Sequence, residues 1–344
     1  MDSPFPNAAT GDPRIDPHAL WPDYRPTRLL ALPALARHLG IAQVWAKLES
    51  ERPLGNFKSL GGSFAATRAL ALAMSRAPDR PPPRLVCASD GNHGLAVAVA
   101  AQRAGTTATV YLPGSVDAVR VARIAAAGAE IVRVDGRYDD AVAMAEAAAG
   151  DGAVLIADTS DDPDDPVVAD VMSGYAVLVR ELAAQLAQAQ ARPSHVFAQA
   201  GVGGLAAALV EGLQERMAGA SRMLVVEPAS AACVGHALRL GRLATVEGAL
   251  ATSASMLSCG RASAPALRIL LRHRAGAIAV DEPRLSDAVA QWRKFGEGTT
   301  TTSGAAGLAG LLHVAAAPAR RRRHGLDADS VAVLVISEAA PPSG

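Results

Sequence analysis

The chain has 344 residues and a formal net charge of zero at pH 7, and half of its residues are hydrophobic. This length suits one large or two ordinary domains, and the neutral balance gives no support to a nucleic-acid partner. The N-terminus is acidic and proline-rich, unlike a signal peptide, and no charge-free apolar stretch reaches the roughly 20 residues that span a bilayer. We therefore expect a cytoplasmic protein without a membrane partner.

The predicted elements alternate between short apolar runs and longer alanine-rich segments. The predicted strands are 85–88, 109–112, 130–134, 154–157, 195–199, 223–226, 277–280 and 331–336. The predicted helices are 94–104, 118–127, 138–149, 168–189, 205–217 and 284–292. Such alternation with continuous apolar strands indicates parallel sheets covered on both faces. Eight strands exceed one small Rossmann unit, so we predict an α/β fold with two doubly wound open sheets.

The stretch NFKSLGGS, residues 56–63, contains one of only three lysines in the chain, Lys58. A lysine forms a Schiff base only when its amine is deprotonated, and we expect the apolar neighbours Phe57 and Leu60 to lower its pKa in that direction. Gly61 and Gly62 would let a bulky ring lie close. The alternative is a surface lysine near a turn. It is weakened here because the chain uses arginine almost everywhere else, and arginine cannot form a Schiff base.

Two glycine-containing loops directly follow predicted strands, where ligands bind in doubly wound folds. SDGNHG, residues 89–94, offers N–H groups at a helix start, a carboxylate at Asp90 and an amide at Asn92. A plain strand–turn–helix with Asn92 as the helix cap is the alternative. GVGG, residues 201–204, suits one phosphate but lacks the spacing of a Walker or dinucleotide loop. An amine for an aldehyde and a cup for one phosphate together predict pyridoxal phosphate (PLP) as the cofactor.

In this order and at these separations, the three motifs resemble the fold-type II PLP enzymes, the group of threonine dehydratase and the tryptophan synthase β chain. The similarity runs from about residue 25 to Ser337. It implies a smaller α/β domain, 68–167, inserted into a larger PLP-holding domain formed by 1–67 and 168–344. The diaminopropionate ammonia-lyase subfamily is the most similar, on Asp90, on ADTS (157–160) with MSGY (172–175), and on VVEP (225–228) with SMLSCG (255–260).

The resemblance implies the residues that bind the cofactor. Lys58 would carry PLP as a Schiff base, with Phe57 near the ring and Asn92 bound to the phenolic oxygen. Ser337 would face the pyridine nitrogen, and its neutral hydroxyl would leave that nitrogen unprotonated. The phosphate would be bound by the glycine loop, which comprises Gly201, Val202, Gly203 and Gly204.

The resemblance also implies the reaction. Lys58 would take the Cα proton of an L-substrate, Asp90 that of a D-substrate, and Asp158 would help to bind the side-chain amine. The products of 2,3-diaminopropionate, or of a close relative, would be pyruvate and ammonia. A serine/threonine dehydratase or a β-replacement synthase remains an alternative, as does, more remotely, a non-catalytic nucleotide-binding Rossmann protein. The family resemblance further suggests a homodimer.

Some positions depart from the subfamily pattern or leave a choice open. Thr302 stands where the family has a glutamate before its S-G-A, and the region after Asp158 lacks the usual aromatic residue. Cys233 and Cys259 lie where the subfamily also has cysteines, so a disulfide is possible in principle, but the expected compartment favours two buried thiols. The three cysteines show no CxxC spacing, so we expect no metal.

Overall fold

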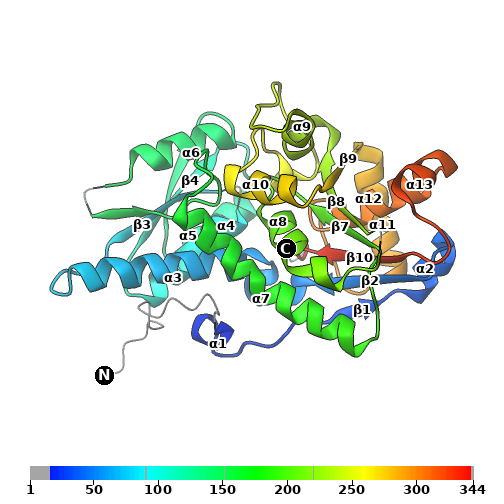
Figure 1. The fold of residues 1–344 in the computed structure, drawn as a ribbon. Coiled ribbons are helices and arrows are strands. Elements are labelled where there is room, and N and C mark those ends of the chain that lie inside the picture. Colours follow the sequence, from blue (N-terminus) through cyan, green and yellow to red (C-terminus); the bar gives the residue numbers. More distant parts are fainter. Residues whose placement is uncertain (1–15, 90, 151, 220, 342–344) are drawn as a thin grey trace. The chain divides into compact units, whose positions relative to one another are not determined.

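The computed structural model describes residues 16–89, 91–150, 152–219 and 221–341 (Figure 1). The described chain forms two compact units. Unit 1 contains residues 16–25 and 58–177, and unit 2 contains residues 26–57 and 178–341. The predicted site residue Asp90 lies outside the described residues.

Unit 1 is built on a four-stranded parallel sheet in the order β5-β4-β3-β6. The strands are β3 (Arg84–Ala88), β4 (Ala108–Pro113), β5 (Glu130–Val134) and β6 (Ala153–Leu155). The helices are α1 (Pro17–Leu20), α3 (Lys58–Arg76), α4 (Asn92–Arg103), α5 (Ala118–Ala126), α6 (Tyr138–Ala147) and the first part of α7 (Pro166–Gln188). Because α4 and α6 both pack against β3 and β4, these central strands are apolar and almost completely buried.

Unit 2 is built on a six-stranded sheet in the order β1-β2-β10-β7-β8-β9, in which only β1 is antiparallel to its neighbour. The strands are β1 (Leu29–Ala31), β2 (Gln43–Leu48), β7 (His195–Gln199), β8 (Arg222–Pro228), β9 (Gly276–Val280) and β10 (Val331–Ile336). The α-helices, besides the rest of α7, are α2 (Pro33–Leu39), α8 (Gly204–Leu213), α9 (Cys233–Leu240), α10 (Ala264–Arg272), α11 (Glu282–Phe295), α12 (Ala306–Ala315) and α13 (Pro318–His324).

Strand β10, the last in the sequence, lies in the middle of this sheet between β2 and β7. Its alternate residues Leu334 and Ile336 join one core with Phe197 of β7, Trp292 of α11 and the apolar face of α12. The intervening residues point to the opposite face of the sheet and are also buried. The carboxyl ends of β7 and β10 therefore meet at a reversal of strand order, which is where ligands bind in open α/β sheets.

A buried charge cluster connects strand β2 and the segment that follows it to helix α7. Lys47 of β2 donates to Glu181 of α7 at 2.6 Å, and Arg52 donates to both Glu181 and Glu49. The side chains of Lys47, Arg52 and Glu49 have no exposed surface, and that of Glu181 has 5%. Two positive and two negative charges balance, so the cluster can remain ionised inside the protein.

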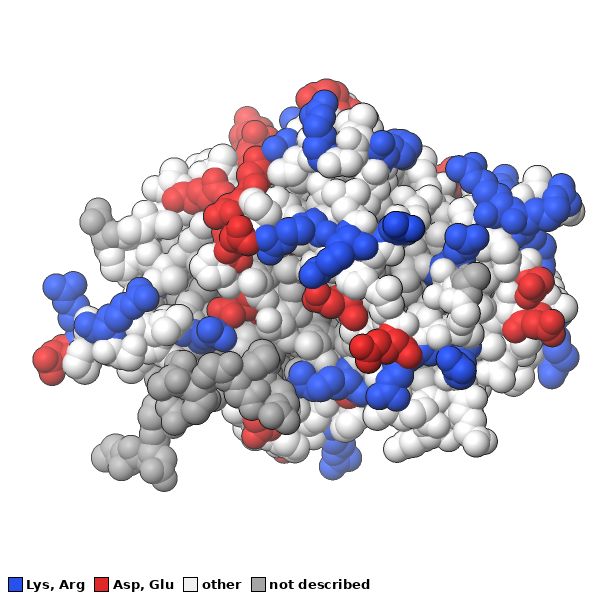
Figure 2. All heavy atoms as spheres, in the orientation of Figure 1, with Lys and Arg blue, Asp and Glu red and all other residues white. Residues whose placement is uncertain are grey.

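The basic run at 320–323 forms most of helix α13, where Figure 2 shows basic side chains gathered on the surface. Two of its arginines bind main-chain carbonyls: Arg320 binds His313, and Arg321 binds Ala315 and Leu39. These contacts cover the open carbonyls near the ends of α12 and α2.

The predicted fold class is confirmed, and each of the eight predicted strands is present. Strands β1 and β2 and helices α1, α2, α3, α9, α10, α12 and α13 were not among the predicted elements. The predicted domain limits at residues 67 and 167 stay a prediction. None of the helices that the structure describes is both long enough and apolar enough to cross a bilayer.

Candidate active site

In unit 1, the Lys58 amine is held by a buried carboxylate. Lys58 is the first residue of α3, and Asp158 lies three residues beyond the end of β6. The Lys58 Nζ donates to Asp158 Oδ2 at 2.5 Å, while the Tyr138 hydroxyl, at the start of α6, donates to Asp158 Oδ1 at 2.5 Å. Three elements thus place an amine, a carboxylate and a phenol in one cluster.

This pairing determines the charge of both groups. Burial alone would lower the pKa of Lys58, but the Asp158 carboxylate outweighs it and the pKa is raised. Burial alone would raise the pKa of Asp158, but the Lys58 ammonium holds it well below its usual range. The prediction that apolar neighbours lower the Lys58 pKa is wrong, because a carboxylate is in direct contact with the amine.

Gly61 lies against the ring of Tyr175, whereas the sequence analysis expected a ligand ring there. A Cβ on Gly61 would overlap the Tyr175 ring of α7 and would lie 2.6 Å from the Val171 carbonyl oxygen. Gly174 is equally restricted, because its Cβ would come within 2.5 Å of the Gly61 Cα. The glycines of NFKSLGGS lie inside helix α3, rather than in a turn: Gly61 allows close packing of α3 on α7, and Gly62 allows close packing of α3 on α4. The Tyr175 hydroxyl also helps to raise the Lys58 pKa, while burial raises the pKa of Tyr175 to about 12.

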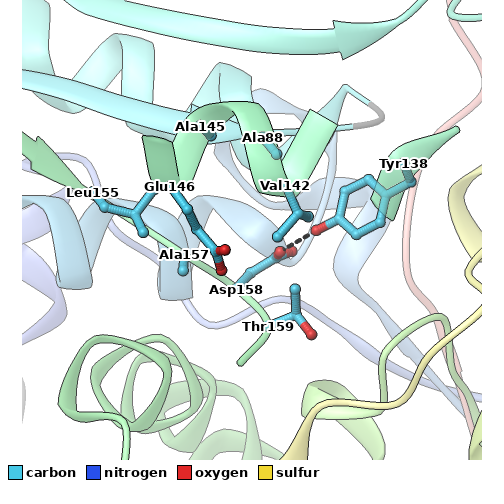
Figure 3. Close-up of a pocket in the computed structure, with 9 residues that line it drawn as sticks. All are labelled: Ala88, Tyr138, Val142, Ala145, Glu146, Leu155, Ala157, Asp158 and Thr159. Carbon is cyan, nitrogen blue, oxygen red and sulfur yellow. Dashed lines mark hydrogen bonds between the residues drawn. The ribbon is translucent and has the colours of Figure 1, made fainter. Parts of the chain in front are cut away.

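A small, partly open pocket borders this cluster (Figure 3). Asp158 and Tyr138 face each other in it, joined by their hydrogen bond, and Val142 lies beside them. The remaining lining residues are Ala88, Ala145, Glu146, Leu155, Ala157 and Thr159. The wall is largely apolar and has two carboxylates, those of Asp158 and Glu146, so it favours a cationic group over an anionic one.

The SDGNHG loop forms the entry to α4. The Ser89 hydroxyl accepts hydrogen bonds from the N–H groups of Gly91 and Gly94, each at 2.8 Å. Asn92 is the first residue of α4 and Gly91 is its N-cap, so the alternative in which the Asn92 side chain caps the helix is wrong. The role of Asn92 toward PLP stays a prediction. His93 of α4 is buried and lies 2.8 Å from the Ile156 carbonyl oxygen through its Nε2.

In unit 2, the GVGG loop follows β7 and starts α8. Gly203 is the N-cap of α8 with φ +106°, a conformation that favours glycine, and no side chain caps this helix. A Cβ on Gly201 would lie 3.1 Å from the Cys259 Sγ and 3.2 Å from the Met256 carbonyl oxygen, so a larger residue there would crowd both neighbours. The first N–H groups of α8 are thus of the kind that bind an anion. Cys233 donates to the Gly201 carbonyl at 3.3 Å, and the three cysteines are buried thiols, as expected.

Ser337 directly follows β10 and is 4% exposed. The Gln199 Nε2, at the end of β7, donates to the Ser337 Oγ at 2.9 Å. The Ser337 carbonyl accepts from the Phe57 N–H at 3.1 Å, and the Gly55 carbonyl accepts from the Ala339 N–H at 2.9 Å. These bonds attach the chain immediately before Lys58 to the segment that carries Ser337.

Sequence reasoning missed four polar side chains of these clusters: Tyr138, Tyr175, Gln199 and Glu338. Tyr175 was quoted only as part of a motif. Glu338 was within reach of such reasoning, because it directly follows Ser337 at the end of a predicted strand. Its carboxylate accepts from Thr301, while its main-chain carbonyl accepts from Thr300 at 2.7 Å. A buried carboxylate thus lies beside the TTTSGAAG segment, although Thr302 itself binds the Ser253 carbonyl.

The described residues fit PLP on three observations. Lys58 supplies a largely buried amine in contact with a carboxylate. The glycine loop supplies a helix start without a side-chain cap from its N-cap residue, and a Cβ at Gly201 would be crowded. Ser337 supplies a buried hydroxyl at the carboxyl end of a central strand. A two-sheet α/β fold with these features is typical of PLP enzymes of fold-type II.

The chain belongs to the pyridoxal-phosphate dependent enzyme family, whose model matches residues 20–338. The predictions of a PLP-dependent enzyme and of PLP as its cofactor are thereby confirmed. The chain is 33% identical over 251 residues to diaminopropionate ammonia-lyase of Escherichia coli (strain K12), a match that covers 69% of this chain and 63% of that protein. It is 29% identical over 264 residues to L-serine dehydratase/L-threonine deaminase of Homo sapiens, covering 76% of this chain and 74% of that protein.

The fold is similar to a crystal structure of the Escherichia coli diaminopropionate ammonia-lyase in complex with an aminoacrylate-PLP reaction intermediate. The TM-score is 0.82 at 29% identity, and the match covers 94% of this chain and 86% of that chain. In sequence, the chain spans less than two thirds of the curated ammonia-lyases that it matches. The predicted resemblance to this subfamily is confirmed at the level of similarity.

Proposed function

We propose that the chain is a PLP-dependent ammonia-lyase that eliminates the β-amino group of 2,3-diaminopropionate, or of a close relative, to give pyruvate and ammonia. The observation that carries the proposal is Asp158. It is a buried carboxylate that stays charged, lines a small apolar pocket and already binds an ammonium group, that of Lys58. The similarity to diaminopropionate ammonia-lyases supports the same substrate class.

When bound, PLP supplies the electron sink for cleavage of the Cα–H bond. Lys58 would hold the cofactor through its Nζ, and the amine would afterwards take the Cα proton of an L-substrate. Asp158 would stabilise the protonated amine and attract the second ammonium group of the substrate, while Tyr138 holds the carboxylate in place through Oδ1. The N–H groups of the glycine loop would bind the phosphate, and Ser337 would face the ring nitrogen.

Serine or threonine dehydration is the second candidate function, because the human serine dehydratase/threonine deaminase is also similar to this chain. The substrate of that reaction has a hydroxyl in place of the β-amine. It would gain little from a permanently charged carboxylate in the pocket, since a neutral hydroxyl has no charge to pair with Asp158. The role of Asp90 toward D-substrates remains part of the proposal, on the resemblance alone.

The experiment is an assay of 2-oxo-acid release from the PLP-loaded protein with diaminopropionate, serine, threonine and 3-hydroxyaspartate, each in both enantiomers; the first two give pyruvate, threonine gives 2-oxobutyrate and 3-hydroxyaspartate gives oxaloacetate. We expect diaminopropionate to have the highest kcat/KM. The variant Lys58→Ala is the control, because it should lose both turnover and the visible absorbance of lysine-bound PLP. A higher kcat/KM for serine or threonine would contradict the proposed substrate in favour of a dehydratase.

A further inference from the structure

The side chain of Gln199 is surrounded by acceptors on its amide nitrogen side. The Nε2 lies 2.9 Å from the Gly304 carbonyl oxygen, 3.0 Å from that of Val335 and 2.9 Å from the Ser337 Oγ. The Ser303 carbonyl oxygen is slightly farther away, at 3.5 Å. The carbonyl oxygens determine the orientation of the amide, because the reverse orientation would place the amide oxygen against them.

This orientation assigns the proton of the Ser337 hydroxyl. An amide nitrogen donates hydrogen bonds and does not accept them, so the Ser337 oxygen is the acceptor in its contact with Gln199. The hydroxyl hydrogen must therefore point elsewhere. No oxygen or nitrogen accepts it within the part of the chain that the structure describes, although the residue is only 4% exposed. Ser337 is thus a buried donor that is available to a ligand.

We propose that Gln199 is a positioning residue that makes Ser337 a hydrogen-bond donor and thereby keeps the pyridine nitrogen of PLP unprotonated. The inference rests on the proposed function, in which Ser337 faces that nitrogen. An unprotonated pyridine nitrogen only accepts a hydrogen bond, whereas a pyridinium only donates one. Gln199 occupies one of the two lone pairs of the Ser337 oxygen and cannot accept the hydroxyl hydrogen, so an unprotonated ring nitrogen would give that hydrogen an acceptor.

The amide oxygen of Gln199 supports the idea that the residue acts through its Nε2 donor. Its Oε1 is buried and has no hydrogen-bond partner among the described residues. A buried acceptor without a partner is destabilising, and an apolar side chain of the same shape would avoid that cost. Gln199 also lies two residues before Gly201 of the glycine loop and contacts Ser337, which directly follows the neighbouring strand β10.

The test uses the full chain loaded with PLP that is labelled with ¹⁵N in the ring, and the ¹⁵N chemical shift is followed as a function of pH. We expect the wild-type shift to stay at the unprotonated position from neutral to mildly acidic pH. In Gln199→Met the donor is lost and the Ser337 hydroxyl can turn to accept, so the nitrogen should become protonated as the pH falls. We also expect about tenfold weaker PLP binding, since one oriented hydrogen bond is lost.

The control is Gln214→Met, an exposed position in the same unit, which should behave as the wild type does. In a Ser337→Ala background, Gln199→Met should cause no further change in the ¹⁵N titration, because its effect passes through Ser337. An additional change in that background, or an unchanged titration in Gln199→Met alone, would overturn the proposal. A merely structural role would lower the melting temperature and leave the titration as it is.

The wild type alone can also overturn the inference, whether or not the variants fold. A pyridinium shift in the loaded wild type at neutral pH would contradict the role of Gln199, even if the protein releases pyruvate from diaminopropionate. A second outcome is that the loaded protein gives the unprotonated shift but acts only on serine. This outcome would contradict the proposed substrate and leave the role of Gln199 intact. The two failures are therefore distinguishable.

Discussion

The Lys58 Nζ lies 2.5 Å from Asp158 Oδ2, so the amine proposed to hold PLP is paired with a carboxylate 100 residues farther along the chain. In Asp158→Asn the charge that would attract the β-ammonium group is lost, although the size of the side chain is kept. We expect kcat/KM for diaminopropionate to fall about 100-fold, as for loss of a charge-assisted hydrogen bond. Steady-state kinetics with serine as the second substrate is the matched comparison. An equal loss for both substrates would contradict selective binding of the amine.

Tyr138 should contribute through Asp158 alone. In Tyr138→Phe the Asp158 carboxylate loses one donor while the ring remains, so we expect about a tenfold loss of kcat/KM, in line with one hydrogen bond to a charged group. In an Asp158→Asn background the same change should have a much smaller effect. A double-mutant cycle measures this coupling, and simple additivity of the two losses would argue that Tyr138 acts on another group.

Gly61 should tolerate no side chain. A Cβ at this position overlaps the Tyr175 ring and lies 2.6 Å from a main-chain oxygen, so Gly61→Ala must displace α3 or α7. We expect a loss of about 1–3 kcal/mol in the free energy of unfolding. Gly114→Ala is the control, because its Cβ would find only the Val134 oxygen at 3.5 Å, an ordinary contact. Denaturant unfolding of both variants compares the two sites, and similar stabilities would refute the packing argument.

Loss of one charge from the buried cluster should strongly lower the free energy of unfolding. Glu181→Gln removes a negative charge that pairs with both Lys47 and Arg52 and leaves a net positive charge in the interior. We expect a loss of about 3–5 kcal/mol, the usual cost of breaking a buried ion pair on one side. Glu211→Gln, which disrupts an exposed pair with Arg272, should cost less than about 1 kcal/mol. The thermal midpoints of the two variants provide the comparison.

Burial of His195 should make the free energy of unfolding decrease in mild acid. Burial lowers the pKa of His195, and its Nε2 lies 2.9 Å from the His324 carbonyl oxygen. In the unfolded chain a histidine takes up a proton below about pH 6.5, whereas the folded chain resists this. The unfolded state therefore binds more protons as the pH falls, and stability is lost below that pH. In His195→Gln, whose amide can still donate to the carbonyl, urea unfolding should show a weaker decline; an unchanged decline would contradict the role of His195.

Much of the fold and the cofactor were predictable because their signals are local. Continuous apolar runs indicate buried parallel strands, and glycines at strand ends indicate loops that closely approach a ligand. Strand β2 carried no such signal, since QVWAKL has a lysine at Lys47. That residue fits inside a strand only because Glu181, 134 residues away, neutralises it. Helix α3 was missed because Gly61 and Gly62 disfavour a helix, and packing against Tyr175 outweighs that preference.

The family and the cofactor could be predicted from the sequence, since both depend on short motifs in a fixed order. The charge of Lys58, the ring that lies against Gly61 and the proposed direction of the Ser337 proton follow only from the folded chain. The physical reason is that each of these depends on a partner distant in the sequence: Asp158, Tyr175 and Gln199 respectively. Electrostatic and hydrogen-bond energies depend on the distances that folding sets, and motif spacing does not contain those distances.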